Sequence, residues 1–208
     1  MAVRLVVTEA ASALTAERAR HYELIRQRLE RSATAPVRIT HYPDVERLDD
    51  TAVVLSGSNA PWAAHDPGEL ARLGEAVLAF SGPVLGICAG MQLQARFAGG
   101  GVEPAGAAGR SPENGYLQID VTDGLDLLRG LAPQAVVFQH HTDEIAELPE
   151  SFEVLARSSQ CPVQAIADRG RGWFGTQFHP EVSAPEHPAG ESVLRNFFVL
   201  AGVRRPST

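Results

Sequence analysis

The sequence predicts an α/β fold with an open, mainly parallel central sheet flanked by helices, and with antiparallel strands in its second half. The first half alternates short apolar runs with longer amphipathic stretches, the pattern of parallel strands joined by right-handed helical crossovers. The second half holds apolar runs joined by turns, without long helices between them, as in antiparallel sheets. No repeat, linker or low-complexity tract interrupts this pattern, so residues 1–208 are expected to form a single domain.

The spacing of apolar residues predicts the first three elements. Residues 3–7 are a short apolar run, which predicts a buried strand. Residues 15–31 carry apolar side chains at helical intervals and predict a helix. Residues 37–42 alternate apolar and polar side chains, so a second strand is expected there.

The next four elements lead the chain to a cysteine. Residues 52–55 form an apolar run that a Ser-Gly pair ends, and they predict a third strand. Residues 67–81 begin with a proline and carry their apolar side chains on one face, which predicts a helix. Residues 84–87 predict a further buried strand, and residues 89–98 predict a helix that follows it almost directly.

The second half begins with a glycine-rich stretch. Residues 97–115 predict a loop that contains one short strand at most. A closing helix is expected at residues 190–201, which are rich in apolar side chains. Between the loop and this helix, strands are expected at residues 116–121, 135–139, 152–158, 163–168 and 172–177.

The composition argues against several classes of function. The formal net charge is −7 and no basic stripe occurs, so nucleic acid is not an expected partner. All 18 basic residues are arginine, which excludes a lysine nucleophile. No apolar run approaches the roughly 20 residues of a membrane span, and no signal-peptide core is visible. The two cysteines form no disulfide framework, so a reducing cytoplasm is the expected setting and Cys161 is expected in the core.

The stretch GPVLGICAGMQLQ, residues 82–94, places Cys88 where a strand becomes a helix. A strand that ends in Gly-X-Cys-X-Gly and opens a helix has the form of a nucleophile elbow. Gly86 and Gly90 lack side chains, so strand, turn and helix can pack closely and expose the sulfur. A cysteine at a helix N-terminus favours the thiolate, and the backbone N–H of Ala89 would point at an oxyanion.

A cysteine nucleophile needs a base, and the chain has seven histidines. The sharpest context is GWFGTQFHPEVS, residues 172–183, where a strand carries His179 to its end. Pro180 fixes a bend that lets the carboxylate of Glu181 approach the imidazole. Glu181 would then hold the tautomer and orientation of the base. These residue types and spacings predict a Cys88–His179–Glu181 triad.

These motifs resemble those of the class I glutamine amidotransferases. GICAGMQ and TQFHPEVS look like the two signatures of that family, and their separation of about 90 residues also fits. VVLSGSNAPW, residues 53–62, corresponds to the oxyanion strand of the family, and QHHTDEI, residues 139–145, to its Ser-His-x-Asp-Glu-Val segment. FEVLARSSQCPVQAIA, residues 152–167, is similar to the amidotransferase part of GMP synthetases. The resemblance implies a flavodoxin-like arrangement of the sheet, and it is weak over the first 50 residues.

The resemblance also implies a reaction. Cys88 attacks the side-chain amide of glutamine with the help of His179, ammonia leaves, and water releases glutamate from a thioester. The ammonia passes to a separate synthetase partner, because this chain contains no P-loop and no acceptor-domain motif. No cofactor and no metal site is predicted.

The functional positions of the family map onto individual residues of this chain. The two oxyanion N–H groups correspond to those of Ser58 and Ala89. The positions that bind glutamine correspond to Gly57, Gln92, His140, Thr142 and Asp143.

Two positions depart from the family pattern. The common oxyanion pattern is Ser-Gly-Gly-Pro, whereas this chain has Ser-Gly-Ser-Asn-Ala-Pro, so Ser58 replaces a glycine. A positive φ at Ser58 would be strained, and correct orientation of the oxyanion peptide would then depend on a docked partner. His140 stands where the family often has a small residue, and it would narrow the glutamine pocket or contact the partner. His140 and His141 are adjacent on a strand and point to opposite faces, so they are not expected to share a metal.

Two alternative functions remain open at this point. A γ-glutamyl hydrolase or peptidase would use the same triad without a synthetase, and would turn over γ-glutamyl peptides faster than free glutamine. A degenerate domain would only bind or regulate a partner. The intact Cys88, His179 and Glu181 argue against the degenerate domain, and Ser58 is its best support.

Overall fold

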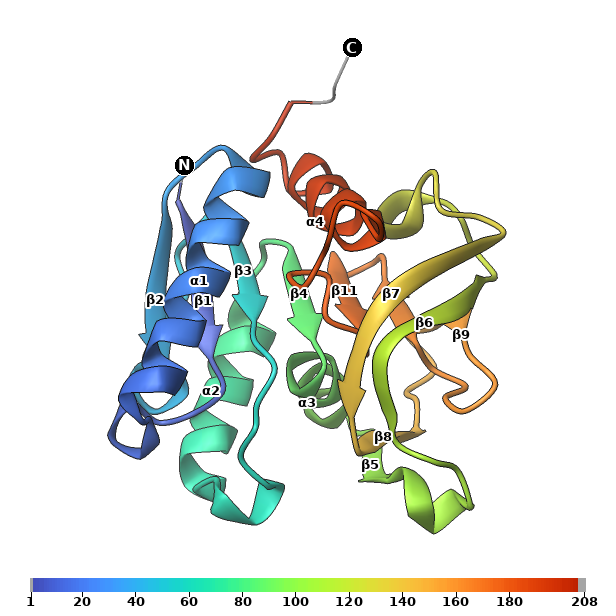
Figure 1. Ribbon diagram of the computed structural model, residues 1–208. Helices are drawn as coiled ribbons and strands as arrows, with labels where there is room; N and C mark the ends of the chain where they lie inside the picture. Colours follow the sequence, from blue (N-terminus) through green and yellow to red (C-terminus); the bar gives the residue numbers. More distant parts are fainter. Residues whose placement is uncertain (1, 206–208) are drawn as a thin grey trace.

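A nine-stranded mixed sheet forms the centre of the molecule in the structure, a computed structural model that describes residues 2–205 (Figure 1). Its strands are β1 (Val3–Val7), β2 (Val37–His41), β3 (Ala52–Leu55), β4 (Val84–Ile87), β6 (Glu113–Val121), β7 (Gln134–His141), β9 (Glu153–Arg157), β10 (Ala165–Asp168) and β11 (Trp173–Thr176). Their spatial order is β2-β1-β3-β4-β11-β10-β9-β6-β7.

The two halves of this sheet differ in strand direction. The strands β2, β1, β3, β4 and β11 pair in parallel, in the order 2-1-3-4-5 of flavodoxin-like folds. The pairings from β11 through β10, β9 and β6 to β7 are antiparallel. The predicted fold class, parallel first and antiparallel in the second half, is therefore confirmed.

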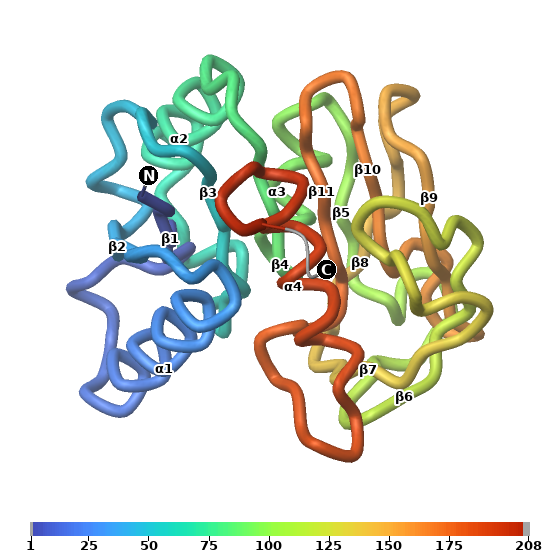
Figure 2. The backbone as a smooth tube through the Cα atoms, turned by 90° about the horizontal axis from the view of Figure 1, so that it is seen from above, coloured from blue at the N-terminus to red at the C-terminus, as the bar shows by residue number. Residues whose placement is uncertain are grey.

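Four α-helices cover the two faces of the parallel half. They are α1 (Ala16–Ala33), α2 (Pro67–Ala79), α3 (Ala89–Phe97) and α4 (Ala189–Leu200). Helices α1 and α4 pack together on one face, and α2 and α3 on the other (Figure 2). Within residues 2–205, none of the helices has the length and apolar character that crossing a membrane requires.

Period-two alternation along the buried strands gives each helical layer its own core. In β1, Val3, Leu5 and Val7 contribute to the cluster beneath α1 and α4, whereas Val6 contributes to the cluster beneath α2 and α3. Each cluster removes the apolar face of its helices from water, the dominant favourable term in folding.

Side-chain caps fix the starts of the two longer helices. The hydroxyl of Thr15 accepts a hydrogen bond from the Arg18 N–H (3.2 Å), and the carboxylate of Asp66 accepts one from the Glu69 N–H (2.8 Å). Each such cap contributes about 1 kcal/mol. Pro67 occupies the first turn of α2, where its missing N–H leaves no bond unmade.

A second, two-stranded antiparallel sheet joins β5 (Gly101–Pro104) to β8 (Asp143–Glu147). β5 is the one short strand that the prediction allowed within the glycine-rich stretch. β8 was not predicted from the sequence. Its residues Asp-Glu-Ile-Ala-Glu include three acids, and only one large apolar side chain, Ile145, is buried. β6 also begins at Glu113, ahead of the predicted residue 116, because it keeps pairing with β7 to His141.

The parallel strands end at one edge of the sheet, and this edge holds the predicted site. Leu55 pairs with Gly86, and Thr176 with Ile87, so β3, β4 and β11 end side by side. The residues that follow these ends are therefore brought together, as expected for the carboxyl edge of an open α/β sheet.

Candidate active site

Cys88 alone forms the turn between β4 and α3, since the strand ends at Ile87 and the helix begins at Ala89. Its backbone adopts φ 50° and ψ −109°, a conformation that costs a non-glycine residue about 1–3 kcal/mol. Gly90 permits the tight packing of this turn, because a Cβ atom there would lie 2.3 Å from the Leu55 carbonyl oxygen. The geometry is that of the predicted elbow.

The sulfur of Cys88 points into a polar environment. The Gln177 amide Nε2 lies 3.5 Å from Sγ, and the His140 carbonyl oxygen lies 3.9 Å from it. Cys88 is also the N-cap of α3, whose first N–H groups have no partners within the helix. These groups and the helix dipole favour a negative charge at this position.

His179 and Glu181 form a close pair next to this sulfur. The distance between His179 Nδ1 and Glu181 Oε1 is 2.7 Å, and Glu181 is buried. Burial alone would lower the pKa of His179, but the negative charge of Glu181 and the neighbouring Cys88 side chain outweigh it and raise this pKa well above its ordinary value. The structure thus brings together all three residues of the predicted triad. The guanidinium of Arg28 on α1 additionally donates to the Glu181 carbonyl.

Gly57, in the segment after β3, lies beside the imidazole of His179 and the side chain of Cys88. A Cβ atom at Gly57 would lie 2.9 Å from His179 Cε1 and 3.5 Å from Cys88 Cβ. A side chain there would displace the imidazole, so this position requires glycine for steric reasons.

Two adjoining cavities open on the site. One, of about 530 Å³, is lined by Cys88 and by the predicted residues Ser58, Ala89, Gln92, His140, Thr142 and Asp143. The other, of about 500 Å³, is lined by Gly57, His179, Glu181 and residues of α1. The two cavities share a wall formed by Ser58, Asn59, Asn114 and His140. Every predicted site residue therefore borders one of these two spaces.

Comparison with known proteins gives the family. The family model "Glutamine amidotransferase class-I" matches residues 17–201. The chain belongs to the class I glutamine amidotransferases. It is 36% identical over 163 residues to one subunit of the glutamine-hydrolyzing GMP synthase of Pyrococcus abyssi, covering 78% of this chain and 82% of that protein. It is 38% identical over 164 residues to the subunit of the same name from Sulfurisphaera tokodaii, covering 77% and 82%.

Solved structures agree with this amidotransferase assignment. A crystal structure of a Thermoplasma acidophilum protein assigned to GMP synthase, as one of its subunits, superimposes with a TM-score of 0.78 at 27% identity, covering 97% of this chain and 94% of that one. The glutaminase domain of Trypanosoma brucei CTPS superimposes with a TM-score of 0.72, covering 100% and 96%. That domain is only 13% identical, so the likeness speaks for the fold alone. The predictions of the family and of a glutamine-hydrolysing enzyme are confirmed.

The expected strain in the oxyanion segment of this amidotransferase is absent. Among residues 2–205, the non-glycine residues with positive φ are Thr34, Cys88 and Asp126, so Ser58 is not one of them. Its hydroxyl instead accepts a hydrogen bond from the Ala60 N–H (3.0 Å), which stabilises the local turn. The strain that a positive φ would have caused does not arise, because this turn does not use a left-handed residue at position 58.

The residues predicted to bind glutamine surround the larger cavity in different ways. Gln92 is buried, and its amide Nε2 donates to the Asp143 carbonyl (2.9 Å) and to Gln177 Oε1 (3.1 Å). Thr142 is exposed and Asp143 half-buried at the start of β8. His140 is exposed, and its Nδ1 lies 3.2 Å from the Asn114 side-chain oxygen.

Gln177 is a site residue that the sequence analysis missed. It is fully buried and contacts both Cys88 Sγ and Gln92. The sequence could have indicated Gln177, because it precedes His179 by two residues. Side chains two residues apart point to the same side of an extended chain.

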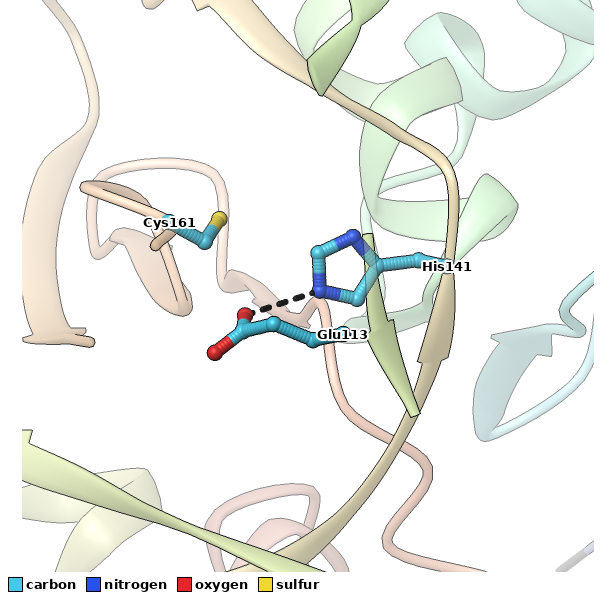
Figure 3. Close-up of side chains that lie close together, drawn as sticks. All are labelled: Glu113, His141 and Cys161. Atoms are coloured by element: carbon cyan, nitrogen blue, oxygen red, sulfur yellow. Dashed lines mark hydrogen bonds and ion pairs between the residues drawn. The ribbon is translucent and has the colours of Figure 1, made fainter. Parts of the chain in front are cut away.

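A buried polar cluster supports the segment that carries Asp143. Glu113, His141 and Cys161 hold their ligand atoms within 4.8 Å of one another, a spacing compatible with a metal ion (Figure 3). The Glu113 carboxylate, however, already faces His141 Nε2 (3.1 Å) and accepts from Ser158 Oγ (2.8 Å) and Gln164 Nε2 (2.5 Å). Burial raises the pKa of the Cys161 thiol to about 12, which opposes the thiolate that a metal needs. These contacts describe a structural hydrogen-bond network, in which His141 Nδ1 lies 3.2 Å from the Asp143 carbonyl.

Proposed function

We propose that Cys88, His179 and Glu181 hydrolyse the side-chain amide of glutamine in this chain, within a single glutaminase domain formed by residues 1–208. One observation carries the proposal. The half-buried His179, paired with the buried Glu181, lies against a cysteine that is held in a strained turn at the N-terminus of a helix. Such a turn has a structural cost, and it presents the sulfur at the carboxyl edge of the sheet.

The geometry supports a two-step acyl transfer. Cys88 loses its proton to His179, and the sulfur attacks the amide carbon to form a tetrahedral intermediate. The His179 imidazolium then protonates the leaving nitrogen, so ammonia departs and a glutamyl thioester remains. Water, deprotonated by His179, attacks the thioester, and glutamate leaves as the thiol forms again. Glu181 holds the imidazole in one orientation throughout and stabilises its cationic form.

The negative oxygen of each tetrahedral intermediate needs two hydrogen-bond donors. The backbone N–H of Ala89 is available because it belongs to the first turn of α3. The N–H of Ser58, across the same cavity, is the second donor in this proposal.

The α-amino and α-carboxylate groups of glutamine would lie at the far end of the larger cavity. Gly57, Gln92, His140, Thr142 and Asp143 are the binding residues in this proposal. The Asp143 carboxylate suits an ammonium group, and the polar groups of the exposed Thr142 suit a carboxylate.

We further propose that the ammonia goes to a separate synthetase subunit, in the manner of a GMP synthase. The relatives that are single GMP synthase subunits are matched over 82% of their length, whereas the longer GMP synthase of Bacillus subtilis is matched over only 28% of its length. The match to relatives that are named as one subunit of a GMP synthase supports a second subunit as the partner.

Reconstitution tests both proposals. The chain is combined with the synthetase subunit of the same genome, and glutamine hydrolysis and GMP formation are measured with glutamine or with ammonium chloride. Cys88→Ala should lower glutamine-dependent GMP formation by about 10⁴-fold or more and leave ammonia-dependent formation unchanged. Loss of both activities would make Cys88 structural. Faster turnover of γ-glutamyl peptides than of glutamine would instead identify a γ-glutamyl hydrolase.

A further inference from the structure

The carbonyl oxygen of Gly57 faces three buried hydroxyl groups, of which those of Thr8 and Ser56 are nearest. Thr8 Oγ1 donates to this oxygen at 2.8 Å, and Ser56 Oγ donates at 2.7 Å. Both side chains are buried, and they follow β1 and β3 directly. The Tyr22 hydroxyl lies farther from the same oxygen, at 3.2 Å. A carbonyl oxygen has two lone pairs, and the two shorter contacts satisfy them.

The next peptide is held by a buried carboxylate. The N–H of Asn59 donates to Glu9 Oε1 (2.8 Å), which also accepts from the Tyr22 hydroxyl (2.8 Å). Arg18 on α1 pairs with the other oxygen of Glu9 at 2.6 Å. Burial, together with the charge of Glu9, raises the pKa of Tyr22, so its hydroxyl remains a donor. The peptides on both sides of Ser58 are thus fixed by side chains that follow β1 and β3 and by side chains of α1.

This arrangement sets the direction of one N–H group. In a trans peptide, the C=O and the following N–H point in opposite directions. The Gly57 carbonyl points at Thr8 and Ser56, so the Ser58 N–H points away from them. Within residues 2–205 this N–H donates no hydrogen bond. A flip of the peptide would remove the nearest acceptor of both the Thr8 and the Ser56 hydroxyl group, which is unfavourable.

We propose that Thr8, Ser56 and Glu9 are positioning residues that hold the Ser58 N–H as an oxyanion donor before any partner docks. The inference rests on the proposed glutaminase function and adds three residues to it. Thr8 and Glu9 lie ahead of residues 17–201, which match the family model. They act through the backbone of Ser58 and touch no reacting atom.

The test compares Thr8→Val, which replaces the hydroxyl group with a methyl group of similar size, with Thr8→Ser, which retains the hydroxyl group. Thr8→Val and Ser56→Ala should each lower kcat for glutamine about tenfold, and the double variant roughly 10²-fold, near the effect of deleting one oxyanion donor. KM should change little, and Thr8→Ser should retain activity close to that of the wild type. Alkylation of Cys88 by iodoacetamide, which forms no oxyanion, should keep its wild-type rate in every variant.

A matched control removes a buried hydroxyl group elsewhere. The hydroxyl of Tyr42 accepts from the Asp66 N–H and has no contact with the oxyanion segment, so Tyr42→Phe should leave kcat unchanged. Equal losses in Thr8→Ser and Thr8→Val, a rise in KM at constant kcat, or full activity of the double variant would overturn the proposal. Ser56→Ala provides the same test if Thr8→Val does not fold. A wild-type chain that hydrolyses no glutamine with its partner would instead overturn the proposed function.

Discussion

The parallel and antiparallel halves of the sheet contribute to the site by different means. In the parallel half, backbone geometry places the reactive groups. Cys88 is the turn after β4, and Gly57 follows β3 within two residues. In the antiparallel half, a hydrogen-bond network of side chains supports the residues. Glu113 on β6 contacts His141 on β7, and His141 contacts the carbonyl of Asp143. The same carbonyl accepts a hydrogen bond from Gln92 on α3.

This difference indicates that the two halves of the sheet have different roles in the site. Backbone positions at strand ends are fixed by the sheet itself, and they suit groups whose alignment with a transition state decides the rate. Side-chain networks around a cavity suit groups that bind the unreactive end of a substrate. Substitutions in the parallel half should therefore lower kcat, and substitutions in the antiparallel network should raise KM.

The largest expected effect concerns the base and its orienting carboxylate. His179→Ala should lower kcat by roughly 10⁴- to 10⁶-fold, and Glu181→Gln by a smaller factor of roughly 10² to 10⁴. Glu181→Gln also removes a charge that raises the pKa of His179. The imidazolium that protonates the leaving nitrogen would then lose its proton at a lower pH, so the alkaline limb of the kcat/KM profile should move toward neutral pH.

The pH profile from pH 5 to 10 checks this expectation. Acid pH should not restore the rate lost in His179→Ala, since that variant lacks the imidazole altogether. An unchanged alkaline limb in Glu181→Gln would show that the carboxylate does not control the pKa of His179. The contrast between the parallel and antiparallel halves of the sheet would then be smaller than proposed.

A smaller effect should arise in the antiparallel network. Glu113→Gln replaces one acceptor oxygen with an NH₂ group that faces donors, which loosens His141 and its contact with the Asp143 carbonyl. The weakening of about one hydrogen bond should raise KM for glutamine about five- to tenfold while kcat stays within about twofold. Steady-state kinetics test this.

Glu147→Gln is a suitable control, because it makes the same chemical change on β8 at an exposed position. A fall in kcat for Glu113→Gln at constant KM would contradict the proposed division between the halves.

The smallest effect tests the strain in the elbow. Cys88→Gly should be more stable than Cys88→Ala by about 1 kcal/mol, because glycine adopts φ 50° without strain. The strain energy relieved is larger than the extra conformational entropy that glycine loses on folding. For a chain of this size the melting temperatures should differ by about 2–4 °C. Thermal unfolding measures the difference, with Ala89→Gly as a control that should lower stability. A less stable Cys88→Gly would mean that the turn is not strained.

Much of the parallel half could be predicted from local sequence. The strands Val3–Val7, Ala52–Leu55 and Val84–Ile87 have the predicted bounds, because continuous apolar runs between turn residues allow few alternatives. The elbow and the His-Pro-Glu segment were also visible, since each places its functional residues within a few positions of one another.

The features that the sequence did not predict depend on contacts between segments that are far apart in the chain. Thr8 and Gly57 are 49 residues apart, and nothing local in β1 indicates that its next residue holds an oxyanion peptide. Gln177 resembles any polar strand residue until Cys88, 89 residues away, is placed beside it. β8 is polar in sequence and is defined by its pairing with β5, which local propensity does not encode.

The contact between Gly90 and the end of β3 has a consequence for heating. The helix that carries the nucleophile and the strand that leads to Gly57 meet backbone to backbone, since even one added methyl group would lie 2.3 Å from the Leu55 carbonyl oxygen. No flexible side chain lies between them to absorb thermal motion, so the two segments move as one rigid unit. The distance between sulfur and oxyanion donor should therefore persist up to the unfolding transition, and irreversible loss of activity should begin where the sheet itself begins to melt.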